Sequence, residues 1–381
     1  MELKRIVKYL MLIFLIILGF SNCNQEKKSV TPTHPDEPHQ NSNFYKRFEG
    51  TIAGQPVVMQ LHKTNENFSG NYYYRNTGGW LSINADTIFS DSIILNEFAE
   101  AYNENTYDEA NKPQLRCKLE NDVLTGSWIS ADKKTSYPIN LKESYPQGSY
   151  KFFIEDYADS TKAFPAVKES PSAELRYTFV SAENNKWLNG EIKKIINYDS
   201  TLNFKDGYNK IKTEYFSAYK KEFPVTADSV SMQETSNHSL SQNLTVRFNE
   251  NNFVILEASE YNYSGGMHGN YGSYFHCYDM VTKKQLILSD IISADSMILQ
   301  HEVEKHFALQ YKLKDSLNEI LFENYLPANS NFYFNEKGIT FLYNPYEVAS
   351  YTQGEISVFI PFTALKKYLQ LEFRKRMHLN L

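Results

Sequence analysis

Between residues 44 and 148, apolar and polar positions alternate in short runs separated by turn residues. The period of two is typical of strands with one buried face, and no stretch carries the 3.6-residue apolar period of an amphipathic helix. Gly70, Gly79 and Gly126 each stand close before an aromatic residue, as expected at strand bends. The pattern predicts a small all-β domain over 44–148, a meander that forms a strongly curved sheet or an open barrel. Its aromatic residues serve either as core and edge packing, which we favour, or as a platform for sugar rings.

The pattern changes after residue 148. Residues 173–180 are typical of a strand, and apolar residues at helical spacing predict helices near 187–196 and 208–219, the first with Asn184 or Asn185 as its cap. The remaining predicted elements are strands at 226–236, 240–249 and 252–263, a helix over 296–324, and further strands within 331–360. The region 172–370 is therefore predicted to be α+β, with helices packed on an antiparallel sheet.

The first 22 residues are typical of an export signal. A basic start precedes the apolar run 11–20, which is too short for a permanent membrane span but suits a signal peptide. The run leads to Cys23 and resembles a bacterial lipoprotein signal, although Phe20 and Asn22 depart from the commonest residues there. We expect cleavage before Cys23, lipidation of its thiol and attachment to a membrane of the cell envelope. The alternatives are an uncleaved N-terminal anchor, or ordinary cleavage beside an incidental cysteine.

Residues 23–43 have almost no large apolar side chains and are rich in Pro, Asn, Ser and charged residues. Such a segment cannot bury enough surface to offset the entropy of ordering, so it is predicted to be a flexible linker.

Composition narrows the classes of partner. The net charge is −6 with no long basic block, which argues against nucleic acid as a partner.

The 28 Tyr and 25 Phe residues suit twisted antiparallel sheets. Cys117 and Cys277 are 160 positions apart, and we favour two separately buried thiols over a disulfide between them.

A glycine-rich run from Tyr263 to Gly272 precedes a predicted strand, and an Asn-Pro-Tyr-Glu segment begins at Asn344. Glycine permits a positive φ and a close approach of the backbone, so a tight loop here would present side chains and N–H groups to a ligand. The alternative is a plain turn between two long strands, with His268 filling a polar hole, and a strand-ending turn at Pro345. The candidate ligand-binding residues are Tyr263, Gly265, Gly266, His268, Gly269, Asn270, Tyr271, Asn344 and Tyr346.

These two segments, with the strand pattern that follows each, resemble the extracellular domain family of the RsiV anti-sigma factors. The resemblance covers about 172–370, as a first module at 172–263 and a second at 264–370, and the same pair of modules accompanies certain peptidoglycan deacetylases. In the anti-sigma factors this ectodomain binds lysozyme, so the resemblance implies lysozyme or peptidoglycan as a partner. We expect no deacetylase domain beside these modules in this chain.

Catalytic signatures are weak. His301 and His306 are five positions apart, which places their rings on different sides of a helix and disfavours a shared zinc ion. The sequence contains no nucleophile elbow and no P-loop. We therefore expect a non-catalytic binding protein without metal or cofactor, whose ligand is a lysozyme-like protein or a peptidoglycan-derived glycan. The alternatives are a glycan-modifying enzyme without a recognised motif and a structural envelope lipoprotein, and the oligomeric state is left open.

Overall fold

The N-terminal region is a closed β-barrel. The structure, a computed structural model, describes residues 43–88, 92–99, 111–223 and 236–379. Eight strands pair antiparallel in chain order, and β1 also pairs with β8, which closes the sheet. The meander was predicted, but the expected open barrel or curved sheet is wrong, because Phe48–Ile52 pair with Ile139–Glu143. The strands are β1 (Phe44–Ile52), β2 (Gln55–Thr64), β3 (Asn67–Tyr74), β4 (Trp80–Ile88), β5 (Ile93–Ala99), β6 (Gln114–Glu120), β7 (Val123–Ile129) and β8 (Ser136–Glu143).

Apolar side chains fill the barrel interior, because the alternating pattern points one face of every strand inward. Gly70 is needed for close strand pairing, since a Cβ there would lie 2.0 Å from the backbone oxygen of Gln60. Tyr72 and Trp80 are 0% and 4% exposed, so packing rather than an aromatic platform describes them.

The second sheet has six strands in the order β14-β13-β12-β11-β10-β9. Its strands are β9 (Phe152–Lys162), β10 (Ser172–Ala182), β11 (His238–Glu250), β12 (Phe253–Tyr263), β13 (Asn270–Asp279) and β14 (Lys284–Gln285). The prediction of a purely antiparallel sheet is wrong, because β10 and β11 run parallel. Two helices connect these strands, and such a crossover returns the chain to the same end of the sheet. The predicted strand at 226–236 lies almost wholly outside the described residues.

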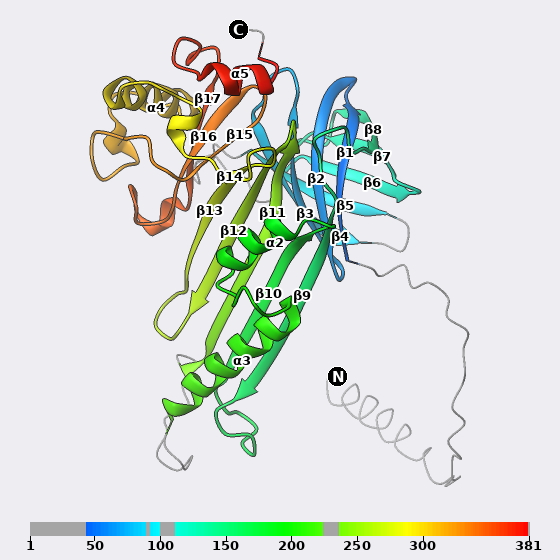
Figure 1. The fold of residues 1–381 in the computed structure, drawn as a ribbon, viewed down its shortest axis with the longest axis vertical. Helices are drawn as coiled ribbons and strands as arrows, with labels where there is room; N and C mark the ends of the chain where they lie inside the picture. The colour runs from blue at the N-terminus through cyan, green and yellow to red at the C-terminus, as the bar shows by residue number, and fades with distance from the viewer. Residues whose placement is uncertain (1–42, 89–91, 100–110, 224–235, 380–381) are drawn as a thin grey trace, which may run out of the picture. The chain divides into compact units, whose positions relative to one another are not determined.

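The two crossover helices are α2 (Lys186–Ile195) and α3 (Phe204–Lys221), close to the predicted ranges. Asn185 caps α2 by accepting a hydrogen bond from the backbone N–H of Leu188 at 3.0 Å. Both helices lie on one face of the sheet, where they cover β9 and β10 (Figure 1). Leu188, Ile192 and Tyr208 pack from the helices into the core on that face.

The C-terminal region adds a three-stranded antiparallel sheet of β15 (Phe332–Phe334), β16 (Gly338–Tyr343) and β17 (Ile356–Pro361). It also contains α4 (Ser296–Gln310) and α5 (Leu371–Arg376). The predicted helix over 296–324 is wrong beyond Gln310, where the chain turns and Lys312 takes a φ of 55°. Leu321 is still buried and Leu317 and Ile320 pack against the core, so the apolar positions that suggested a longer helix belong to a looped segment packed into the core.

Two further features bear on the predictions. Cys117 and Cys277 are both buried free thiols, so the expectation of separate thiols is confirmed. None of the helices in the described ranges combines the length and apolar composition that crossing a membrane requires.

Candidate functional site

The predicted glycine loop is the hairpin connection between β12 and β13, residues 264–269. Gly265 and Gly266 have φ values of 93° and 103°, a conformation that side-chain-bearing residues rarely adopt. The hydroxyl of Tyr263 donates to the backbone oxygen of Gly266 at 3.0 Å and closes the turn. The positive φ expected in this loop is therefore present at its tip. The boundary expected between two modules at 263/264 falls at this hairpin, inside one continuous sheet.

The other two glycines of the run act through close packing. A Cβ on Gly269 would lie 2.5 Å from the ring of Tyr261. One on Gly272 would lie 3.0 Å from the Oδ1 atom of Asn344. Both positions allow neighbouring side chains to lie against the hairpin backbone.

The fold brings the two candidate segments together around Tyr351, which the sequence analysis did not select. Tyr351 stacks on His268 with ring centroids 4.2 Å apart. Its ring also makes an edge-on contact with Tyr271 and a tilted contact with Tyr346, at centroid distances of 5.6 and 5.5 Å. Its hydroxyl donates to the backbone oxygen of Gly269 at 2.9 Å. We call His268, Tyr271, Tyr346 and Tyr351 the aromatic cluster. The sequence offered one signal for Tyr351, since it is an aromatic residue five positions after Tyr346 of the Asn-Pro-Tyr-Glu segment.

Asn344 holds the second segment against the hairpin. Its Oδ1 atom accepts from the backbone N–H of Ser273 at 2.7 Å, and its Nδ2 atom donates to the backbone oxygen of Ser273 at 3.2 Å. Its own N–H donates to Glu347 at 2.9 Å within the turn. Asn344 therefore positions the segment, while Tyr346, which is 56% exposed, projects from it.

A surface pocket of about 360 Å³ lies beside the hairpin, lined in part by His268, Asn270 and Tyr271. Glu260, Asn262 and Tyr274, which is 55% exposed, line the pocket from the face of the sheet opposite to that of Tyr271. The pocket thus combines flat apolar faces with hydrogen-bonding groups, which is the chemistry that sugar rings require. Met267, at the tip of the loop, is fully exposed.

No group of three or more His, Cys, Asp or Glu side chains within the described ranges is placed to hold a metal ion. His306 lies on α4 with its Nδ1 atom 2.7 Å from the backbone oxygen of Glu302 and 3.5 Å from the Glu302 carboxylate.

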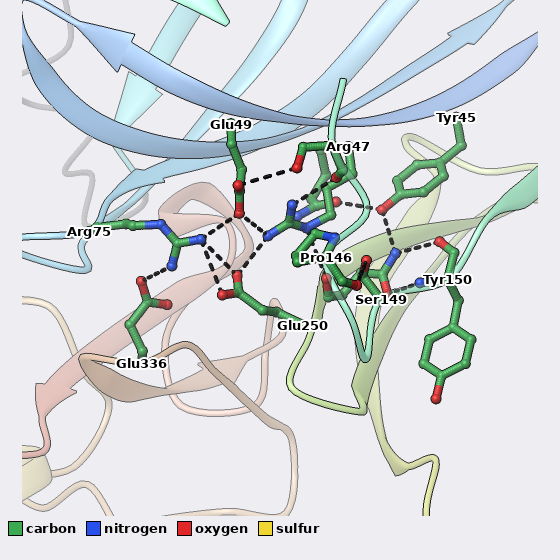
Figure 2. Close-up of polar contacts among 12 residues, drawn as sticks. Tyr45, Arg47, Glu49, Arg75, Pro146, Ser149, Tyr150, Glu250 and Glu336 are labelled. Atoms are coloured by element: carbon green, nitrogen blue, oxygen red, sulfur yellow. Dashed lines mark hydrogen bonds and ion pairs between the residues drawn. The ribbon is translucent and has the colours of Figure 1, made fainter. Parts of the chain in front are cut away.

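A charged cluster that sequence reasoning missed connects the barrel to the six-stranded sheet (Figure 2). Arg47 on β1 is fully buried, and its Nη2 atom lies 2.8 Å from Glu49 and 2.7 Å from Glu250 on β11. Its Nε and Nη1 atoms donate to the backbone oxygens of Asn249 and Ser144, each at 2.9 Å.

Arg75 extends the cluster from Glu49 and Glu250 to Glu336, which lies 2.9 Å from its Nη1 atom. Burial raises the pKa of Glu336, whereas the pKa of Glu49 is lowered because Arg47 and Arg75 outweigh the effect of burial. Since all three nitrogens of the Arg47 guanidinium donate to protein groups, the cluster joins two parts of the fold. No spacing in the sequence indicated it, because its members are up to 289 positions apart (Arg47 to Glu336).

In a comparison with known proteins, residues 282–363 match the model of the family described as protein of unknown function (DUF3298). A curated protein, the peptidoglycan-N-acetylmuramic acid deacetylase PdaC of Bacillus subtilis (strain 168), is 26% identical over 213 residues, 50% of this chain. The chain spans 44% of the length of that relative. The expected likeness to a peptidoglycan deacetylase is confirmed to this extent, and the specific likeness to the RsiV ectodomain stays a prediction.

A solved structure shares the fold of part of this chain. A DUF3298 family member from Bacteroides fragilis aligns with a TM-score of 0.55 at 18% identity, covering 60% of this chain and 98% of that one. A DUF3298 family protein from Pseudomonas aeruginosa aligns with a TM-score of 0.40 at 20% identity, covering 58% of this chain and 95% of that one. The first likeness shows a shared fold over most of the B. fragilis protein.

Proposed function

We propose that this chain is a cell-envelope protein that binds peptidoglycan-derived glycan, without catalysing its turnover, at the aromatic cluster and the adjoining pocket. The observation that supports the proposal best is the convergence of His268, Tyr271 and Tyr346 on Tyr351 at the rim of a pocket with carboxylate and amide groups. Tyrosine offers an apolar ring and a polar hydroxyl in one side chain, which matches the two kinds of surface on a sugar. The likeness to a peptidoglycan deacetylase supports the same class of ligand.

The experiment is a pull-down with purified peptidoglycan sacculi, using residues 41–381, which form one compact unit. We expect retention on sacculi, and we expect Tyr271→Ala to reduce it while Tyr137→Ala, an exposed tyrosine on the barrel, leaves it unchanged. Equal retention of both variants would contradict the proposed site. Release of acetate or of new reducing ends from the sacculi would instead support the rival interpretation, a glycan-modifying enzyme.

A lysozyme-like protein is the second candidate ligand. The net charge of −6 suits a basic partner, and the projecting hairpin with its fully exposed Met267 suits insertion into a protein surface. A lysozyme-inhibition assay with the same unit separates the candidates. Inhibition that Met267→Ser weakens would favour the protein ligand, whereas retention on sacculi without inhibition would favour glycan. Absence of both inhibition and retention would favour the purely structural interpretation.

Attachment to the envelope through Cys23 is part of the proposal, and Cys23 lies outside the described residues. Several acyl chains together anchor a protein stably where one does not. We expect Cys23→Ala to leave the protein either unprocessed or released from the membrane fraction. Acyl chains on the N-terminus of that variant, detected by mass spectrometry, would rule out lipidation at Cys23.

A further inference from the structure

A second pocket, of about 210 Å³, lies where all three sheets meet. Ser82 of the barrel contributes to it, and the rest of its lining comes from the other two sheets and the segment before β17. We call it the Arg247 pocket. Its polar side is formed by Arg247, Glu257 and Glu355, and its apolar side by Phe275, Tyr333 and Leu342. Ligand pockets are common at such junctions between parts of a fold.

The Arg247 guanidinium is held rigidly. The residue is 5% exposed, and its guanidinium carbon lies 4.8 Å from the ring centroid of Trp80 and 4.7 Å from that of Tyr333. The Nη1 atom lies 3.3 Å from the Glu257 carboxylate. Buried ion pairs are often less stabilising than apolar residues of the same volume, so an ion pair beside an open pocket suggests a role in binding.

The pocket holds ionisable groups of both charge signs. One guanidinium faces two carboxyl groups, and the pKa of Glu355 is raised, mainly by burial and also by Glu257, against the lowering effects of Ser273 and Arg247. A free carboxylate ligand would meet Glu257 and Glu355, and an ammonium group would meet Arg247. A neutral ligand group with one acceptor and one donor is the best match, because Arg247 can donate and Glu355 can accept.

The Arg247 pocket lies on the same side of the sheet as part of the aromatic cluster. Glu257 and Tyr261 are four residues apart on β12, opposite Phe275 and Tyr271 on β13. Because alternate side chains share a face, this spacing places Glu257 and Tyr261 about 13 Å apart along one face. The segment after β16 also connects the two sites, since Tyr351 belongs to the cluster and Glu355 lines the pocket.

We propose that the Arg247 pocket is the subsite for the N-acetyl group of an amino sugar, whose neighbouring rings lie on the aromatic cluster. The acetyl methyl would pack against Phe275 and Leu342, its carbonyl would accept from Arg247, and the amide N–H would donate to Glu355. This inference rests on the proposed function and adds that N-acetylated glycan is preferred over de-N-acetylated glycan.

The test uses calorimetric titration of residues 41–381 with an N-acetylglucosamine trimer and with the matching glucosamine trimer. The unaltered protein should bind the acetylated trimer roughly tenfold more tightly than the glucosamine trimer. The glucosamine trimer lacks the acetyl group and would leave buried polar groups of the pocket without a partner. Arg247→Met, which keeps the volume, and Leu342→Phe, which fills the apolar side, should both abolish this preference. Arg176→Met is the control, because Arg176 on β10 pairs with Asp156 on β9 and neither residue lines the pocket, and this variant should keep the preference.

The outcomes separate the two proposals. If the folded Arg247→Met and Leu342→Phe variants keep the preference while Tyr271→Ala lowers binding of both trimers, the pocket inference is overturned and the proposed function stands. If the pocket variants lose the preference and Tyr271→Ala has no effect, the pocket is supported and the aromatic cluster is not the site. Failure of the unaltered protein to bind either trimer would overturn both. Melting temperatures identify any variant that has not folded, and Leu342→Phe serves if Arg247→Met is unstable.

Discussion

At the scale of single residues, the sequence indicated where glycine was needed but not the reason for each glycine. The run from Gly265 to Gly272 was selected for conformational freedom, and the structure divides it into two kinds of position. Gly266 needs glycine for its φ, whereas Gly269 needs it because Tyr261 lies against the backbone. Tyr351 was missed because two of its three ring neighbours, His268 and Tyr271, lie about 80 positions earlier in the chain.

Gly266→Val should lower the free energy of unfolding by about 1–3 kcal/mol, because valine is strained at a φ of 103°. Nothing lies within 4 Å of the added Cβ, so the cost comes from the backbone rather than from a clash. Gly190→Ala is a suitable control, because Gly190 lies within α2 with open space around it, and alanine there should stabilise by up to about 1 kcal/mol. Urea unfolding measures both variants. A Gly266→Val protein as stable as the original would show that the loop relaxes freely.

At the scale of elements, periodicity found most strands and both crossover helices but misjudged three features. Barrel closure depends on pairing between β1 and β8, about 90 residues apart, which no local pattern encodes. The parallel pairing of β10 with β11 follows from the path of α2 and α3. The helix beyond Gln310 was predicted from apolar spacing that a looped segment also satisfies when it packs into a core.

An ion pair holds α5 against the end of β13, and it should make stability depend on pH. Both terminal nitrogens of Arg376 bind Asp279, with the Nη2–Oδ1 distance at 2.9 Å. Burial alone would raise the pKa of Asp279, but Arg376 and the N–H groups of residues 281 and 282 outweigh it, so the pKa is lowered. A lowered folded-state pKa contributes stability above the unfolded value of about 3.9, and this stability is lost as the pH falls through the folded value.

Asp279→Asn should therefore lower the melting temperature at pH 7, and the difference from the unaltered protein should shrink below about pH 4. Melting curves at several pH values give this comparison. A difference that is constant down to the lowest accessible pH would mean that the charge of Asp279 is not what stabilises this contact.

At the scale of the whole molecule, the Arg47 cluster joins the barrel to the six-stranded sheet (Figure 2). A fully buried guanidinium that loses a carboxylate is costly, on the order of 3–5 kcal/mol when no partner remains. Glu250→Ala should cost somewhat less than this, because Glu49 still lies 2.8 Å from Arg47. Glu120→Ala, which breaks the exposed pair with Lys118, should cost no more than about 1 kcal/mol. Equal destabilisation by the two variants in urea unfolding would contradict a structural role for the cluster.

Glycan binding at the aromatic cluster is tested most directly by calorimetric titration with a peptidoglycan-derived oligosaccharide. His268 and Tyr271 are exposed or partly exposed, so His268→Ala and Tyr271→Ala should leave the melting temperature nearly unchanged. Each should weaken binding by roughly tenfold or more, as expected for the loss of an anchoring side chain. If both variants instead melt much earlier while binding per folded molecule is unchanged, the cluster is a structural turn and the ligand binds elsewhere.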